Sequence, residues 1–184
     1  MIFDLPQVLT VNGHVYEIRT DFRDILNIVL AFNDPDLSES EKAYVCLYVL
    51  YVDFETIPAE DYNACFKEAL RFIDGGSTNE RVKPRTMDWE QDASILFPAV
   101  NSVAGFETRS TEYLHWWTFL GYFMEIKEGT FSTVLHLRSK KIKNKKLEKW
   151  EKDFWQENIE LCKLKPKYSR EELEEQARLK ALLG

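Results

Sequence analysis

The sequence contains none of the short motifs that identify common catalytic or nucleotide-binding sites. No GxSxG, GxxxxGKS, GxGxxG or HExxH pattern occurs in its 184 residues. The histidines His14, His115 and His136 have no neighbouring His, Cys or carboxylate at a spacing that suits a metal ion. A catalytic pair that only the fold assembles leaves no trace in one sequence, but nothing local predicts a nucleophile with its base. The sequence therefore predicts no enzyme activity, no metal and no cofactor.

Cysteine is scarce and hydrophobic runs are short. The three cysteines are odd in number and no two form a CxxC pair, which fits a reducing compartment and thiols that pack as small hydrophobic groups. The first residues lack the basic-then-apolar pattern of a signal peptide. The longest apolar run, residues 43–52, is about half the length of a membrane span. We therefore expect a soluble, cytoplasmic protein with no membrane contact.

Charge is plentiful but unevenly distributed along the chain. The formal net charge is −7, yet residues 138–152 contain eight basic and two acidic side chains, a local charge of +6 that leaves −13 on the rest. The candidate contact residues in this segment are Arg138, Lys140, Lys141, Lys143, Lys145 and Lys146. Because the rest of the chain is acidic, the segment can also attract a second copy, and self-association is expected to weaken as salt rises.

Three interpretations of this basic segment remain open. It can be a solvated turn followed by the start of a helix. It can contact an acidic protein surface through complementary charge. It can also contact nucleic acid, which is the least favoured, since lysines outnumber arginines here and bidentate base recognition prefers arginine. The acidic balance of the whole chain points the same way, because nucleic-acid-binding domains are generally basic.

Aromatic side chains make up 14% of the sequence, and the adjacent pair Trp116-Trp117 is the most informative of them. Neighbouring positions on a helix point about 100° apart, so the two rings cannot share one direction. One ring is predicted to enter the core. The other is either a second core contact or an exposed anchor for a partner, because tryptophan is enriched where binding energy concentrates.

Hydrophobic periodicity predicts a mainly α protein with one small β-hairpin. The hairpin spans about residues 7–19, because Asn12-Gly13 is a strong two-residue turn signal between apolar stretches at 8–11 and 15–18. Helical patterns follow at about residues 21–32, 38–54, 58–73, 89–98, 114–126, 130–144, 147–162 and 169–184. We expect one helical domain over residues 1–165 and a charged C-terminal helix over residues 166–184.

Capping signals locate several of these helices. Ser38 with Glu41 forms a capping-box pattern at the start of the second helix, which is apolar all round and is therefore expected to be central. Asp88 with Gln91 predicts that the fourth helix begins near residue 89. Pro98 is expected to kink or end that helix, because proline cannot donate the helical hydrogen bond.

Two further segments carry specific expectations. Residues 75–85 are rich in Gly, Ser, Asn and charge, which is typical of a polar, mobile loop. Leu147, Trp150 and Phe154 follow a helical stripe, so all three are predicted to be buried in the core. A turn is expected around Asn144, within the basic segment.

Residues 88–160 carry the most specific resemblance to a known family. The matching clusters are Asp88-Trp89-Glu90-Gln91-Asp92, residues 95–101, Leu114-His115-Trp116-Trp117-Thr118-Phe119, Gly129-Thr130-Phe131-Ser132, and a last segment with Leu137, Arg138, Lys140, Lys141, Lys145, Lys146, Leu147, Phe154 and Asn158. Together they resemble the family called bacteriophage gene product fifteen, from phages of Gram-positive bacteria. The hairpin and first helices are compatible with it, whereas residues 169–184 match no pattern of the family.

The resemblance implies a role in building phage tails. Members of this family are encoded between the major tail protein and the tape-measure protein, the position typical of tail assembly chaperones. Such proteins coat the tape measure, recruit tail-tube subunits and leave before the tail is finished. The implied partners are therefore the tape-measure protein and the major tail protein, the implied location is the host bacterial cytoplasm, and the finished virion is expected to lack the protein. The family offers no catalytic residues. The alternatives are a structural tail component that stays in the virion and, less favoured, a nucleic-acid-binding regulator.

Overall fold

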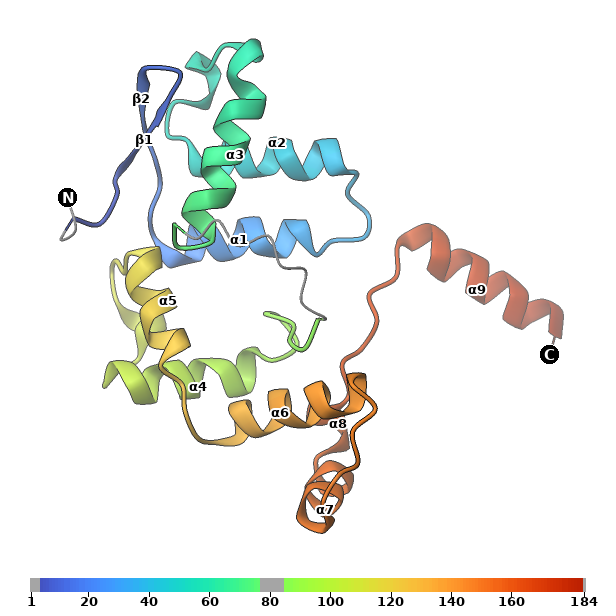
Figure 1. Cartoon of the computed structure of the whole chain (residues 1–184). Helices are drawn as coiled ribbons and strands as arrows, with labels where there is room; N and C mark the ends of the chain where they lie inside the picture. The colour runs from blue at the N-terminus through green and yellow to red at the C-terminus, as the bar shows by residue number, and fades with distance from the viewer. Residues whose placement is uncertain (1–3, 77–84, 184) are drawn as a thin grey trace. The chain divides into compact units, whose positions relative to one another are not determined.

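The computed structural model describes residues 4–76 and 85–183 and is mostly helical (Figure 1). Its strands are β1 (Val8–Val11) and β2 (His14–Glu17), and its helices are α1 (Phe22–Phe32), α2 (Glu39–Leu50), α3 (Tyr62–Ile73), α4 (Ala93–Ala104), α5 (Trp116–Met124), α6 (Thr130–Ile142), α7 (Lys149–Glu157), α8 (Ile159–Cys162) and α9 (Arg170–Leu183). Single 3-10 turns lie at Phe54–Thr56, Ala59–Asp61 and Thr108–Ser110. The predicted fold class, mainly α with an N-terminal hairpin and a C-terminal helix, is confirmed.

The chain divides into two compact units. Unit 1 lies within residues 1–73 and 166–184, and unit 2 lies within residues 74–165. The boundary after residue 165 coincides with the predicted start of the C-terminal segment, whereas the boundary after residue 73 was not predicted. That residues 1–165 fold as one domain stays a prediction, because compactness does not measure folding.

The hairpin of unit 1 follows from its turn. Asn12 and Gly13 both have positive φ angles, 49° and 86°, which join β1 and β2 in an antiparallel pair. The Asn12 side chain donates a hydrogen bond of 2.7 Å to the Asp61 carboxylate, just before α3 begins. The same residue therefore makes the turn and ties it to the helices.

Three helices make the core of unit 1. α1 packs on α2, and α2 packs on α3. The fully buried side chains include Phe22, Ile25, Ile28, Cys46, Leu50, Tyr51, Cys65 and Phe72. The Tyr51 hydroxyl donates a hydrogen bond of 2.8 Å to the Cys65 carbonyl, so the largest polar side chain of this core has a partner.

The second helix differs from its prediction in length and in burial. Its capping box is confirmed, since Ser38 and Glu41 exchange the expected hydrogen bonds, but α2 ends at Leu50 and is not buried on all sides. Tyr44 and Tyr48 are 54% and 56% exposed. The pattern counted tyrosine as apolar, although its hydroxyl allows the ring to stay at the surface.

The fourth helix begins later than expected and passes through its proline. α4 starts at Ala93, later than predicted, and continues through Pro98 to Ala104, so Pro98 does not end the helix. Pro98 removes one helical donor, and the carbonyl that loses it belongs to Ser94, an exposed residue where water can take its place. Gly105, with φ 80°, then ends the helix in the left-handed conformation.

The predicted helix over 147–162 is two helices, α7 and α8, and its stripe is only partly buried. Asn158 interrupts it with φ −118° and ψ 39°, and its side chain donates a hydrogen bond of 3.0 Å to the Phe154 carbonyl. Leu147 is buried and Phe154 is half-buried against Val134, but Trp150 is 57% exposed. Trp150 therefore lies outside the core, contrary to its prediction.

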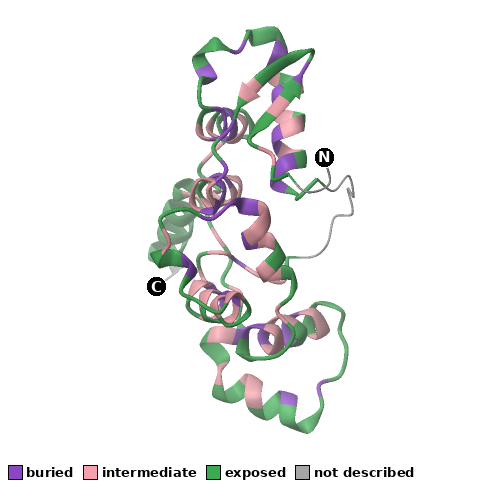
Figure 2. Ribbon diagram, turned by 90° about the vertical axis from the view of Figure 1, so that its left-hand side faces the viewer, coloured by how far each residue is buried: buried purple, intermediate pink, exposed green. Residues whose placement is uncertain are grey.

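The C-terminal helix begins as predicted and lies on the surface. Ser169 and Glu172 exchange the hydrogen bonds of a capping box, and the Arg170 backbone N–H donates a hydrogen bond of 2.7 Å to Asp36 of unit 1. Every side chain described from Arg170 to Leu182 is exposed. Figure 2 shows the contrast with the other helices, which carry buried residues on one side. The predicted polar loop over 75–85 falls mostly on residues 77–84, outside the described residues.

Candidate interaction site

Arg138, at the start of the basic segment, is buried in unit 2. Its guanidinium is 3% exposed and forms a two-armed ion pair with the Asp92 carboxylate, with N–O distances of 2.7 and 2.8 Å. Asp92 is 1% exposed and occupies the N-cap position of α4, although its side chain makes no capping hydrogen bond there. A buried guanidinium cannot reach a partner, so Arg138 is a structural residue and does not belong to the exposed basic surface where the sequence placed it.

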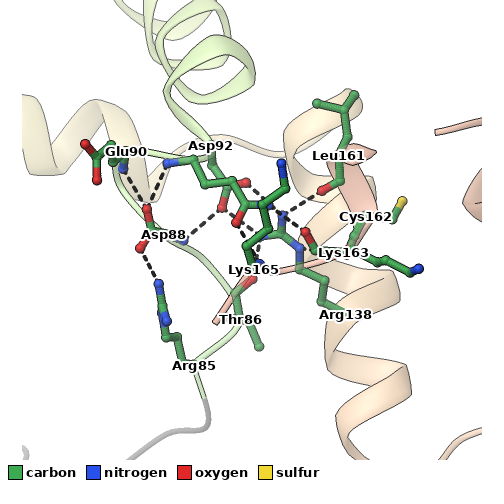
Figure 3. Close-up of polar contacts among 11 residues, drawn as sticks. Arg85, Thr86, Asp88, Glu90, Asp92, Arg138, Leu161, Cys162, Lys163 and Lys165 are labelled. Atoms are coloured by element: carbon green, nitrogen blue, oxygen red, sulfur yellow. Dashed lines mark hydrogen bonds and ion pairs between the residues drawn. The ribbon is translucent and has the colours of Figure 1, made fainter. Parts of the chain in front are cut away.

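The remaining donors of Arg138 bind backbone carbonyls. They reach the carbonyl oxygens of Leu161, Cys162 and Thr86 at 2.6, 3.1 and 3.1 Å (Figure 3). The first two carbonyls lie at the end of α8, where helical carbonyls lack partners within the helix. One arginine therefore connects α4, α6 and α8 and satisfies polar groups that would otherwise be buried without partners.

Gln91 and Asp88 complete this network in a way that the sequence did not predict. The Gln91 amide does not close a capping box with Asp88: it donates to the Lys163 carbonyl at 2.6 Å and accepts from the Lys165 N–H at 2.8 Å. Asp88 instead accepts from the N–H groups of Glu90 and Gln91 and pairs with Arg85. These bonds make a turn before α4, which explains why the helix starts four residues later than expected.

A second buried carboxylate organises the junction between α6 and α7. Glu151 is 1% exposed and accepts from the Lys140 ammonium at 2.6 and 2.8 Å and from the Glu148 N–H at 2.7 Å. His136 lies 3.2 Å from the same carboxylate. The hydrogen bonds from Lys140, then those from the Glu148 backbone and His136, hold the pKa of Glu151 below its ordinary value. Lys140 is thus an intramolecular partner as well as a member of the basic run.

The chain reverses at Asn144, where the sequence predicted a turn. Asn144 has φ 51°, the Lys145 N–H donates to the Lys140 carbonyl at 2.8 Å, and the Asn144 N–H donates to the Lys141 carbonyl at 3.0 Å. This pair of bonds is the Schellman arrangement that satisfies the last carbonyls of a helix. The turn is therefore held by the backbone and does not depend on its lysine side chains.

Four exposed lysines, which we call the lysine turn, surround Asn144: Lys141, Lys143, Lys145 and Lys146. The Lys141 ammonium lies 4.7 Å from the centre of the Trp155 ring, a cation–π contact. Within the described parts of the chain, the other three ammonium groups make no ion pair. Cations at a helix C-terminus are favoured by the helix dipole, which accounts for part of this clustering but leaves their charges open to a partner.

The tryptophan pair is mostly internal. Trp116 is 2% exposed and stacks on Phe119 with ring centres 5.8 Å apart. Trp117 is half-buried and packs against Gly76, where an added Cβ would lie 3.4 Å from the ring. His115 precedes both and accepts a hydrogen bond of 3.0 Å from the Trp117 N–H, which caps α5. Trp116 is therefore the predicted core residue, and Trp117 is not a fully exposed anchor.

The sequence predicted that one tryptophan of the Trp116-Trp117 pair is either buried or exposed as an anchor for a partner. In the structure, the exposed tryptophan is Trp150. It borders an open hollow of about 400 Å³ in unit 2, together with Lys127, Gly129, Ser132 and His136. A signal for its exposure was present in the sequence, because Trp150 lies between the charged residues 149 and 151–153.

A second surface, which we call the tyrosine face, was missed by sequence reasoning. On α2, the rings of Tyr44 and Tyr48 stack with centres 6.0 Å apart and planes 11° apart. Phe54 meets both rings edge-on, at 5.3 and 5.9 Å. The sequence did contain a signal for this surface. Tyr44 and Tyr48 are four residues apart on α2, and they are its only largely apolar residues with a hydroxyl that favours exposure.

The chemistry of the described side chains offers no activated nucleophile among the cysteines. Burial raises the pKa of the Cys46 thiol to about 12 and raises the pKa of the Cys65 and Cys162 thiols. All three are therefore protonated at neutral pH and pack as hydrophobic groups, as predicted. Over residues 4–76 and 85–183, no three His, Cys, Asp or Glu side chains come close enough together to hold a metal ion.

Comparison with known proteins gives one match. The family described as Bacteriophage Gp15 protein matches residues 2–169, so the matched region ends where α9 begins. Neither the curated proteins nor the solved structures gave a match. In the described part of the chain, none of the helices has the length and apolar content needed to cross a membrane.

Proposed function

Because the chain belongs to the bacteriophage Gp15 family, we propose that it is a non-enzymatic tail assembly chaperone. In this role it binds the tape-measure protein, tail-tube subunits or both in the host cytoplasm, and it leaves before the virion is complete. The observation that supports the proposal is the family match over residues 2–169, together with the tail-module role that the resemblance to this family implies.

The exposed apolar side chains suit such a role. A tape-measure protein is a long helical chain whose apolar face needs cover until the tail tube encloses it. A helix can lay its apolar residues into a shallow hollow on a folded partner, and tryptophan is a frequent anchor at such contacts. Trp150, 57% exposed beside the hollow at the start of α6, is the anchor that we assign to the tape measure.

Co-expression with the tape-measure protein of the same phage tests the proposal. The full chain should raise the soluble fraction of the tape measure, and Trp150→Ser should reduce that gain because it removes the apolar anchor. Val15→Ser is the matched control, since Val15 is 65% exposed on the hairpin and belongs to the other unit.

The outcomes separate the chaperone role from the choice of anchor. A tape measure that is equally insoluble with and without this chain would overturn the chaperone proposal. A tape measure that both Trp150→Ser and Val15→Ser keep soluble would leave the chaperone role standing and remove Trp150 from it. Mass spectrometry of purified particles tests release: a stoichiometric amount of the chain in finished virions would favour the structural tail component.

A further inference from the structure

The two units of the chain differ sharply in charge. Residues 1–73 contain thirteen acidic and five basic side chains, a net charge of −8. Residues 74–165 contain fourteen acidic and fifteen basic side chains, a net charge of +1, and their positive charge gathers at the lysine turn. One molecule therefore offers an acidic surface on unit 1 and a basic surface on unit 2.

The acidity of unit 1 reaches the edge of the tyrosine face. Tyr48 borders an open hollow of about 520 Å³ whose other lining residues include Asp24, Asp53 and Glu55. Asp53 and Glu55 are exposed and make no ion pair with any residue of the described chain. Burial and the nearby Asp21 raise the pKa of Asp24, and the charges of Arg19 and Arg23 offset this only in part.

The arginine in this hollow offsets the charge of Asp24 only in part. The Arg19 guanidinium donates to the carbonyls of Tyr48, Val49 and Tyr51 at 3.3, 2.9 and 3.1 Å, at the end of α2. Its donors on that nitrogen are used by the backbone, and its charge is favourable there because helix carbonyls carry partial negative charge. The hollow thus keeps a negative rim beside two stacked aromatic rings.

A lysine-rich loop fits such a surface in two ways. Ammonium groups pair with exposed carboxylates, and they also bind over aromatic faces, as Lys141 does with Trp155 in this chain. Lys143, Lys145 and Lys146 are exposed, carry no intramolecular ion pair in the described chain, and sit on a backbone turn that is already rigid. Because the turn is pre-ordered, binding costs little backbone entropy.

We propose that the tyrosine face of one molecule, with Asp53 and Glu55 at its edge, binds the lysine turn of a second copy. The contact is head to tail, since each molecule uses one surface for one neighbour and the other surface for the next. A contact of this kind that does not close forms an open row of subunits, and one that closes forms a ring. Each exposed pair contributes little, so the association is weak, reversible and sensitive to salt.

Two neutralised variants of the full chain test this contact. The face variant carries Tyr44→Ser, Tyr48→Ser, Asp53→Asn and Glu55→Gln. The turn variant carries Lys143→Gln, Lys145→Gln and Lys146→Gln. Sedimentation velocity over a range of concentrations should show roughly tenfold weaker self-association for each variant alone. Mixed together, they retain one intact interface per pair and should form a 1:1 complex and nothing larger.

Matched controls keep the test decisive. Lys67→Gln, Lys127→Gln and Lys163→Gln together remove three other exposed lysines and should leave self-association unchanged. Should the serine changes unfold unit 1, a face variant with Asp53→Asn and Glu55→Gln alone measures the charged part of the contact. Each sample is measured before and after nuclease treatment, so that association caused by nucleic acid bridging between lysine turns is recognised.

Several outcomes would overturn the proposal. These are a wild-type chain that stays monomeric at low salt and high concentration, variants that associate like wild type, a mixture that forms no 1:1 complex, and association that disappears after nuclease treatment. The last result would mean that the lysine turn binds nucleic acid. The experiment contains only this chain, so its failure is separate from a failure of the tape-measure proposal.

Discussion

Arg138 and Lys145 belong to the same basic run, yet the first is buried against Asp92 and the second faces solvent beyond the end of α6. Lys140, which lies between them in sequence, is also intermediate in burial: it is partly buried and paired with Glu151. The difference shows that a run of like charges does not make one site. Residues on the inner face of α6 meet carboxylates and become structural, whereas residues past its C-terminus remain available for partners.

The largest effect should come from breaking the buried pair. Arg138→Ala leaves the Asp92 carboxylate buried without its cation, which typically costs about 3–5 kcal/mol of unfolding free energy. Urea unfolding measures this cost. The double variant Arg138→Met/Asp92→Leu should recover only part of it: no desolvated charge remains, but the carbonyls of Thr86, Leu161 and Cys162 lose their donor. An Arg138→Ala chain with wild-type stability would contradict the structural role.

Neighbouring hydrophobic positions give the second contrast. Leu147 is 8% exposed, so Leu147→Ala should cost about 2–5 kcal/mol through lost packing against Val134 and Leu137. Trp150→Ala, three residues later, should change unfolding free energy by no more than about 0.5 kcal/mol because that ring is exposed. Thermal melts of both variants compare the two positions, and equal losses would place Trp150 back in the core.

The Glu151 junction should give a smaller, pH-dependent effect. Its pKa is lowered from 4.5 by Lys140, then by the Glu148 backbone and His136, so the folded state binds a proton there less readily than the unfolded state. The stability that it contributes is therefore present above about pH 4.5 and is lost as pH falls through the lowered pKa.

Glu151→Gln tests this dependence. The melting temperature of Glu151→Gln should lie several degrees below that of wild type at pH 7. The two melting temperatures should converge in acid, because protonation removes the charge of Glu151 whereas Gln is neutral at every pH. Asp153→Asn is the control, as Asp153 is exposed on the same helix and has no ion pair in the described chain. Parallel melting-temperature profiles for Glu151→Gln and wild type across this pH range would show that Glu151 is not the titrating group.

The smallest effect on stability is expected at the lysine turn. Changing Lys143, Lys145 and Lys146 to glutamine removes favourable charge at the end of α6 but leaves the backbone hydrogen bonds of the turn intact. The unfolding free energy should therefore shift by less than about 0.5 kcal/mol in chemical denaturation. A large loss of unfolding free energy would show that these lysines are structural, like Arg138. The contrast between a buried and an exposed part of the basic run would then be wrong.

The sequence by itself determined the elements whose signals are local. Asn12-Gly13 specified the hairpin, Ser38 with Glu41 and Ser169 with Glu172 specified two helix starts, and Asn144 marked the turn. Each of these depends on hydrogen bonds or dihedral angles within a few residues. The lysines of the candidate site were likewise predicted, because their exposure follows from their position in that turn.

Only the tertiary structure decided which side chains of the same type are buried. Asp92 is 46 positions from Arg138, and Glu151 is 11 positions from Lys140, so neither pairing has a signature in the local pattern. Trp116 is internal because of the helix face on which it lies, whereas the charged neighbours of Trp150 already hinted at its exposure. The spacing of the two tyrosines of α2 hinted at a shared face, but whether that face is exposed is set by packing partners that lie elsewhere in the chain.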